Sequence, residues 1–296
     1  YYDKIRHRHS QVLAATGLTP AEFDALLITF KYHWDEYYSH FTLEGKVRQR
    51  ISYNSVVSDS GQNVLHIGIS EDNPLQELHA IQFEMTQPQA NRWIHLLSEI
   101  LRRTLKTLGE LPDRNSKRLI HILQGCEEVL LDGTERPIQR PLDEDGSLHA
   151  IVVKKTHSIK NNLLCTNNLR IVWLSSTYKG HVHDKKICDE EPLLLPKGIR
   201  LWQDTGFIGH KPDGVEICMP KKKPKGKELT CVEKQENKRI SGVRIKVEHA
   251  IGGMKKCRIV KERFRCHKFG FEDMVILIAC GLHNFRISHK MSHITN

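Results

Sequence analysis

Apolar residues recur at helical spacing through the first third of the chain. In the segment GLTPAEFDALLITFKYHWDEYY, apolar positions from Phe23 to Phe30 fall on one side of a helix. Thr19 stands where an N-cap is expected, and Pro20 fits the first turn. The stripe is typical of a core-facing helix, and similar patterns predict a mainly helical domain over residues 1–112.

Two further helical patterns, PLQELHAIQFEM and TQPQANRWIHLLSEILRRTLKTLG, are separated by a short break. Thr86 is positioned to cap the second helix. This is the spacing of a helix-turn-helix motif, in which the second helix enters the major groove of DNA. A helical hairpin packed in a core gives the same pattern. The polar residues able to read base edges are Gln87, Gln89, Asn91 and Arg92.

The pattern changes to strands after Cys126. The segments EEVLLDGTE, HAIVVKKTHSI and NNLLCTNNLRIVWLSS predict three antiparallel strands, with a hairpin turn at Asn167 and Asn168. A capped helical segment, two short strands (GIRLWQD and VEICMP) and a long helix over about 233–256 follow. This is the order of an RNase H-like fold. For residues 113–296 we therefore predict an α/β catalytic domain with a mixed five-stranded sheet.

Two aspartates, Asp132 and Asp204, stand at the ends of predicted strands. Because the first strand lies beside the fourth in this topology, both carboxylates are expected at one edge of the sheet. Glu248 lies in the long helix, four residues after Arg244, so it can point back at the sheet from the same face. The three acids are therefore expected to converge.

Three converging carboxylates repel one another unless a cation lies between them. Mg²⁺ and Mn²⁺ favour carboxylate, water and phosphate oxygens. Each acid alone is more simply explained as a cap or a turn former, but their joint placement favours a site with two divalent ions. Asp132, Asp204 and Glu248 are the predicted ligands, and the predicted chemistry is phosphoryl transfer.

Asp184, in the segment GHVHDKK, competes with Asp204 for the second position. It falls where the crossover helix begins and is a natural N-cap, so we expect it to support the site without holding the metal. His183 is expected to orient a ligand or a phosphate, although a histidine beside a cap is more often structural. Arg244 is assigned a similar supporting position.

Lysine and arginine exceed the acidic residues, and the formal net charge is +10. Such a balance favours a polyanionic partner, because basic side chains displace counterions from phosphates. Solvated surface charge is the simpler alternative. The lysines most suited to phosphate contact are Lys154, Lys155, Lys160, Lys221, Lys222, Lys223, Lys225 and Lys227.

The eight cysteines are scattered without CxxC pairs, so we expect reduced thiols. No apolar run approaches the length of a membrane span. The opening residues, YYDKIRHRHS, lack the apolar core of a secretory signal. We therefore expect a cytoplasmic protein.

Several ordered motifs resemble the DDE superfamily endonucleases of bacterial insertion sequences and, more distantly, the Harbinger-type transposases of eukaryotes. These motifs are LLDGTERP, KKTHSIKN, GHVHDKK, DTGF, KPKGKELT, RIKVEHAIGGMK and ACGLHNFR. The segment NPLQELHAIQFEMTQPQANRWIHLL resembles the helix-turn-helix of the bacterial members, whereas QNVLHIGISEDN departs from the pattern. The resemblance implies that Asp132 of DGT, Asp204 of DTGF and Glu248 of VEHAIGG are the catalytic metal ligands, with Asp184 auxiliary.

The resemblance also implies a DNA transposase, which cleaves DNA at the ends of its element and joins the freed 3′ hydroxyl to target DNA. Its partner would be double-stranded DNA at the bacterial nucleoid, and acting on two ends favours a homodimer or a larger assembly. Three alternatives stay open. They are a domesticated transposase that binds DNA without cutting, a helix-turn-helix regulator, and an RNase H-like nuclease that cannot join strands.

Overall fold

The computed structural model describes residues 5, 7–42, 45–48, 73–139, 157–226 and 228–292. These form two compact units. Residues 1–111, 255–261 and 274–296 belong to the first unit, and residues 112–254 and 262–273 to the second. None of the eight cysteines forms a disulfide in the described part of the chain.

The first unit is helical. Its helices are α2 (His9–Thr16), α3 (Pro20–His40), α5 (Gln76–Gln82), α6 (Gln87–Thr107), α11 (Arg258–Lys261) and most of α12 (Phe271–Ser292). The predicted cap of α3 is confirmed, because Thr19 N donates to the Glu22 carboxylate at 2.8 Å and Thr19 Oγ1 accepts from Glu22 N at 3.2 Å. Among the described residues, no single helix is long and apolar enough to cross a membrane.

Most of the C-terminal helix belongs to the first compact unit. The sequence assigned residues 113–296 to one domain, but Ile278, Leu282 and Phe285 of α12 are buried in the core of the first unit. Their partners there include Leu101 of α6. An apolar helical stripe shows that a helix is buried, but it does not show which core buries it.

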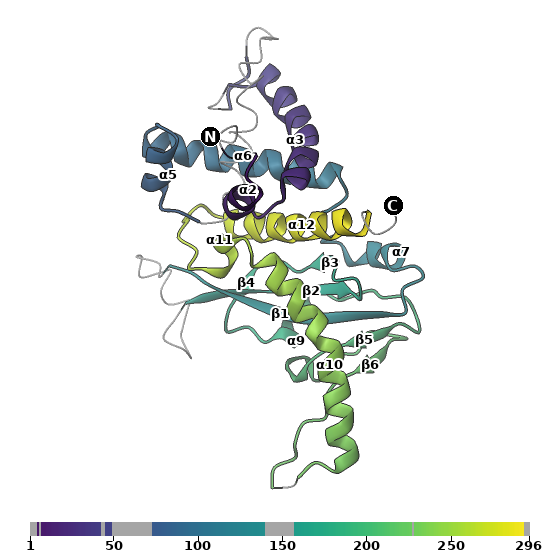
Figure 1. Ribbon diagram of the computed structural model, residues 1–296. Coiled ribbons are helices and arrows are strands. Elements are labelled where there is room, and N and C mark those ends of the chain that lie inside the picture. The colour runs from purple at the N-terminus through teal and green to yellow at the C-terminus, as the bar shows by residue number, and fades with distance from the viewer. Residues whose placement is uncertain are drawn as a thin grey trace. The chain divides into compact units, whose positions relative to one another are not determined.

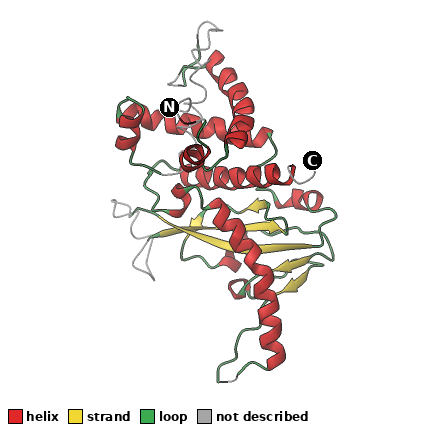
Figure 2. Ribbon diagram, in the orientation of Figure 1, coloured by secondary structure: helices red, strands yellow, loops and turns green. Residues whose placement is uncertain are grey.

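The second unit contains a mixed sheet of six strands in the order β3-β2-β1-β5-β6, with β4 paired to β2. The strands are β1 (Glu128–Pro137), β2 (Ser158–Thr166), β3 (Ile171–Leu174), β4 (Tyr178–Lys179), β5 (Arg200–Trp202) and β6 (Glu216–Cys218). The first three are antiparallel, whereas β5 is parallel to β1 and β6 is parallel to β5 (Figure 2). The α/β class and the element order match the prediction, and the two-residue β4 makes six strands where five were expected.

The second strand runs differently from its prediction. The predicted strand HAIVVKKTHSI begins at residue 149, and residues 149–156 lie outside the described part of the chain. β2 runs without a break from Ser158 to Thr166, all of it in register with β1. The predicted hairpin turn after β2 is confirmed, because Thr166 N donates to Arg170 O at 3.0 Å. Leu169, and neither asparagine, takes the positive φ of 69°.

Helices cover the sheet and extend beyond it. They are η1 (Ser116–Arg118), α7 (Leu119–Ile122), α9 (Asp184–Glu190), η2 (Thr205–Phe207) and α10 (Cys231–Met254). Helix α10 crosses β1 and β5, and its N-terminal half extends past the sheet together with the loop that follows β6 (Figure 1). On β1, Val129 and Leu131 face the core that Cys188 of α9 joins. Since side chains alternate along a strand, Asp132 points to the opposite face.

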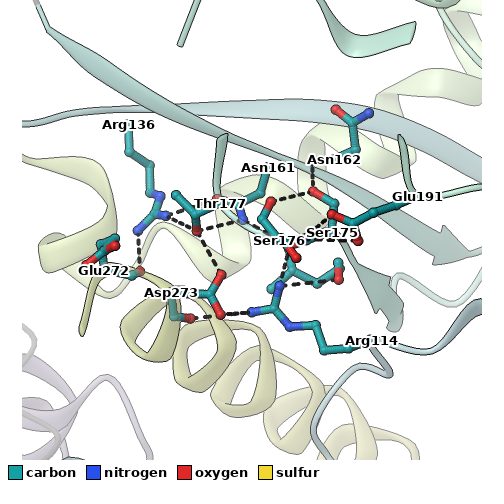
Figure 3. A network of polar contacts seen from close by, with 11 residues as sticks. Arg114, Arg136, Asn161, Asn162, Ser175, Ser176, Thr177, Glu191, Glu272 and Asp273 are labelled. Carbon is teal, nitrogen blue, oxygen red and sulfur yellow. Dashed lines mark hydrogen bonds and ion pairs between the residues drawn. The ribbon is translucent and has the colours of Figure 1, made fainter. Parts of the chain in front are cut away.

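A polar network ties β1 and β2 to the first turn of α12 (Figure 3). Arg136, only 1% exposed, donates from Nη1 to Glu272 O and from Nη2 to Asn161 Oδ1, both at 2.9 Å. Asn161 in turn donates to Thr177 Oγ1 at 3.0 Å, and Thr177 donates to Asp273 Oδ1 at 2.8 Å. Buried polar groups satisfied in this way hold the chain in one arrangement.

We expect Arg136→Leu to destabilise the protein. The substitution leaves the Asn161 and Glu272 acceptors without their guanidinium donor, at a cost of about 1–3 kcal/mol for each buried acceptor. Urea unfolding followed by circular dichroism, without metal, should show the loss. The matched variant Arg263→Leu, at an exposed position, should change the free energy of unfolding by less than about 0.5 kcal/mol. Equal stability of the two variants would contradict this account of the network.

Candidate metal centre

Two aspartates meet where β1 runs past the end of β5. The parallel pairing of these strands ends with Leu130 opposite Trp202. Asp132 and Asp204 each follow two residues later, so they occupy equivalent positions on neighbouring segments. Asp132 lies within β1, which continues to Pro137, and not at the strand end as predicted. The structure nevertheless brings the two carboxylates together at one edge of the β1–β5 pair.

The guanidinium of Arg244 lies between these two carboxylates. Helix α10 carries it across the strands, and Nη2 is 3.6 Å from Asp132 Oδ2 and 3.9 Å from Asp204 Oδ2. Both distances are those of ion pairs and too long for hydrogen bonds. Arg244 Nε is buried and makes no hydrogen bond within the described part of the chain. Arg244 is therefore the positive countercharge of the pair.

Asp184 is a third carboxylate at this place. Its prediction as an N-cap is wrong, because His183 is the N-cap of α9 and neither side chain caps the helix. Asp184 is the first helical residue, and its carboxylate turns to the sheet. A Cβ on Gly133 would lie 2.7 Å from Asp184 Oδ1, and a Cβ on Gly206 would lie 3.0 Å from Asp184 Oδ2. The glycines that follow Asp132 and Asp204 therefore leave the space that this carboxylate occupies.

Two side chains of β2 face Asp184. Lys160 Nζ lies 3.1 Å from Asp184 Oδ1 and donates to Val182 O at 3.3 Å. The ion pair is poorly aligned, so Asp184 Oδ1 is buried without a hydrogen bond. Asn162 donates from Nδ2 to Asp184 O at 2.8 Å, and its Oδ1 is also buried without a hydrogen bond. Sequence reasoning missed Asn162, although an asparagine in the run NNLLC was an available signal.

The third predicted ligand, Glu248, is exposed on α10, one turn after Arg244. Within the described ranges, no three His, Cys, Asp or Glu side chains are grouped so that they could hold a metal ion. His183 is exposed as well and makes no polar contact with the carboxylates. The assignment of Glu248 and His183 to the site thus rests on their sequence positions.

Burial raises the pKa of Asp132 to about 6. The Arg244 charge opposes this shift, while the neighbouring carboxylates Asp204 and Asp184 add to it. The three carboxylates outnumber the two cations beside them, Arg244 and Lys160, and one carboxylate oxygen makes no hydrogen bond within the described part of the chain. Hard oxygen donors suit Mg²⁺ or Mn²⁺. Asp132, Asp204 and Asp184 therefore offer the oxygen donors that suit a hard divalent cation, but within the described ranges they do not form a three-ligand group.

The predicted base-reading residues lie at the start of α6. The cap is confirmed, because Thr86 N donates to Gln89 Oε1 at 2.9 Å. Gln87 Nε2 donates to Gln76 Oε1 of α5 at 2.6 Å. Both glutamines thus already make bonds inside the helical pair, whereas Asn91 is half-buried and Arg92 is exposed. The spacing of two helices and a turn is present, and base reading stays a prediction.

Four of the predicted phosphate contacts lie in the loop between β6 and α10, whereas Lys160 lies on β2 and pairs with Asp184. Lys221, Lys222, Lys223 and Lys225 are exposed in that loop. Lys221 pairs with Glu233 and Lys223 pairs with Glu228, both across the surface. Three other predicted contacts lie outside the described residues: Lys154, Lys155 and Lys227.

Comparison with known proteins gives two matches. The model of the family described as "DDE superfamily endonuclease" matches residues 131–284. A protein described as "Probable transposase for insertion sequence element IS702", from Microchaete diplosiphon, is 26% identical over 164 residues. The match covers 55% of this chain and 58% of that relative. No solved structure matches.

The raised pKa of Asp132 predicts how stability without metal depends on pH. The carboxyl titrates near 4 in an unfolded chain and at about 6 in the folded protein. The folded state therefore binds this proton more tightly than the unfolded chain does. The stabilisation that the bound proton gives to the folded state is lost as the pH rises through about 6. We expect Asp132→Asn, in EDTA at about pH 7, to exceed the parent in stability by up to about 3 kcal/mol.

Urea titrations at about pH 4 and about pH 7 test this expectation, since the difference should shrink at the lower pH. The matched variant Asp213→Asn, at an exposed position, should show no such pH dependence. A loss of stability in Asp132→Asn at both pH values would contradict the expected linkage.

Proposed function

Because this chain belongs to the DDE superfamily of endonucleases, we propose that it is an insertion-sequence transposase that cuts and joins DNA by metal-dependent phosphoryl transfer. One observation carries the proposal: Asp132 and Asp204 occupy equivalent positions beyond the β1–β5 pairing, with Arg244 between them. The strand and helix order of the second unit, typical of RNase H-like folds, supports it. So does the similarity to a probable transposase, of which this chain covers 58%.

In the proposal, Asp132, Asp204 and Glu248 hold two Mg²⁺ or Mn²⁺ ions. Such ions, when bound, activate the attacking oxygen and stabilise the leaving one. Asp132 must be ionised to act as a ligand, so its raised pKa ties metal binding to pH. Arg244, once the carboxylates have another countercharge, is free to pair with a DNA phosphate through its planar donors.

The proposed DNA contacts divide between the two units. The lysine loop that precedes α10 offers point charges for the phosphate backbone without reading sequence. At the start of α6, Asn91 and Arg92 are better candidates for base contacts than the glutamines already bonded inside the helical pair. The proposed partner is double-stranded DNA at two element ends, bound by a homodimer or a larger assembly.

A second candidate is a DNA-binding protein that no longer cuts. The exposed position of Glu248, apart from the other two acids, is the observation that favours it. The deciding experiment incubates the chain with Mg²⁺ or Mn²⁺ and DNA carrying the sequences that flank its gene. A transposase both cleaves this DNA and joins the 3′ end to a target. An RNase H-like nuclease cleaves only, and a DNA-binding protein does neither.

We expect Asp132→Asn, Asp204→Asn and Glu248→Gln each to reduce cleavage by at least about a thousandfold. Each change removes one ligand charge with little change of shape, so DNA binding should be retained. Gel assays of cleavage and of DNA binding measure the two effects. The matched variant Glu236→Gln, which removes an exposed carboxylate from the same helix, should cut normally. Near-normal cutting by any of the three variants would remove that residue from the assignment.

Substitutions in the lysine loop and in α6 should impair DNA binding in different ways. Alanine at Lys222, Lys223 and Lys225 should weaken binding to all DNA sequences and reduce the slope of log affinity against log salt by about 0.9 for each phosphate that is no longer neutralised. Alanine at Asn91 and Arg92 should instead reduce the preference for element ends, by about 1–3 kcal/mol for a bidentate contact.

Binding titrations at several salt concentrations, with end and scrambled duplexes, measure both quantities. A control triple variant with alanine at the exposed residues Lys31, Lys117 and Lys211 removes equal charge elsewhere. If it matches the loop variant, the loop makes no particular contact with DNA. An unchanged end preference in the Asn91 and Arg92 variant would refute base reading by α6.

A further inference from the structure

We propose that Asp184 is itself a metal ligand, which shares a divalent cation with Asp204, and that Lys160 occupies the place of this cation's charge in the metal-free protein. The inference deepens the proposed function and rests on it, because the cation belongs to the same site. It differs from the expectation from the sequence, which gave Asp184 a supporting role and no contact with the metal.

The space around the Asp184 carboxylate favours a role as a metal ligand over a role in positioning neighbouring residues. Gly133 and Gly206 come from segments far apart in the chain, and each leaves room for one oxygen of the same carboxylate. The position of a Cβ on Gly206 lies 3.0 Å from both Asp184 Oδ2 and Asp204 Oδ1. Asp204 Oδ1 accepts from Gly206 N at 2.8 Å, which holds its carboxylate beside that of Asp184, and two neighbouring carboxylates repel each other. Mg²⁺ binds oxygen ligands at about 2.0–2.1 Å, and a cation between the two carboxylates would offset their repulsion.

Two buried acceptors point to the same shortage of positive charge. Asp184 Oδ1 and Asn162 Oδ1 both lack a hydrogen bond in the described structure. They lie 2.7 Å and 3.4 Å from the Cβ position on Gly133, and Asn162 is 0% exposed. A buried acceptor without a donor costs about 1–3 kcal/mol. A cation at Asp184, or a water bound to that cation, would satisfy both oxygens.

The contacts of Asp184 argue against a purely structural role for this residue. It does not cap α9, and its ion pair with Lys160 is poorly aligned. Lys160 keeps a second partner, Val182 O, which holds its ammonium beside the carboxylate. A lysine held in this way supplies the charge that the carboxylates need without metal. It also competes with a divalent cation for Asp184.

The test is a calorimetric titration of Mn²⁺ into the full chain without DNA, near neutral pH. We expect two cations per wild-type chain, and a loss of at least about tenfold in the affinity of one of them in Asp184→Asn. Gly133→Ala keeps every charge but puts a methyl group 2.7 Å from Asp184 Oδ1, and it should cause a similar loss. Lys160→Met removes the competing ammonium and should tighten that same cation.

Asp189→Asn is the matched control, because it removes an exposed carboxylate from the same helix; its titration should equal the wild type. Circular dichroism and thermal unfolding in EDTA establish that each variant folds. Unchanged Mn²⁺ affinity in folded Asp184→Asn would overturn the inference and leave the proposed function standing. If Asp184→Asn does not fold, unchanged affinity in both Gly133→Ala and Lys160→Met would overturn it. A wild-type chain that binds no Mn²⁺ would instead overturn the proposed function.

Discussion

The repulsion between carboxylates at one sheet edge is the constraint on which the rest of this site depends. Asp132 and Asp204 lie at equivalent positions past the β1–β5 pairing, and Asp184 approaches both segments through the space of two glycines. Such a group is stable only with positive charge beside it. Arg244 supplies that charge to the first two acids, and Lys160 supplies it to Asp184. The pKa of Asp132 is raised because the effect of burial is larger than the opposing effect of the Arg244 charge.

The alternation of side chains along β1 distributes the site over both faces of the sheet. Asp132 points to the face that α10 crosses, where Arg244 meets it. The next residue, Gly133, points to the face of α9, and the absence of a side chain there lets the Asp184 carboxylate reach the strand. An aspartate followed by glycine therefore joins two helices on opposite faces at one point. A larger residue at position 133 would close this connection.

Helix α10 links the carboxylates to the lysine loop. Arg244 and Glu248 lie in its C-terminal half, and the lysine loop leads directly into its N-terminus (Figure 1). A single helix thus connects the residues proposed for phosphate binding with those proposed for chemistry. The Arg136 network steadies the other end of β1, the strand that carries Asp132. Asp132, Asp184 and Arg244 thus stand on regular elements, which hold side chains more firmly than loops do, and Asp204 is the N-cap of η2.

Local patterns in the sequence were sufficient for much of this structure. The caps at Thr19 and Thr86, the turn after β2, the α/β class and the convergence of Asp132 with Asp204 all follow from spacing within single elements or from the order of elements. These features depend on neighbours in the chain, or on a topology that has few alternatives. Sequence is informative where short-range chemistry decides the outcome.

Tertiary structure alone decided the remaining features. It assigned α12 to the core of the first unit, turned Asp184 from a helix cap into a neighbour of two glycines, and left Glu248 exposed. Each depends on which side chains from distant segments pack together. The apolar stripe of a helix does not show which core the helix packs against, and the position of a carboxylate in the sequence does not show which cation lies beside it. The sequence pattern therefore predicted which elements carry the acids. Only tertiary packing determined which of their carboxylates come together.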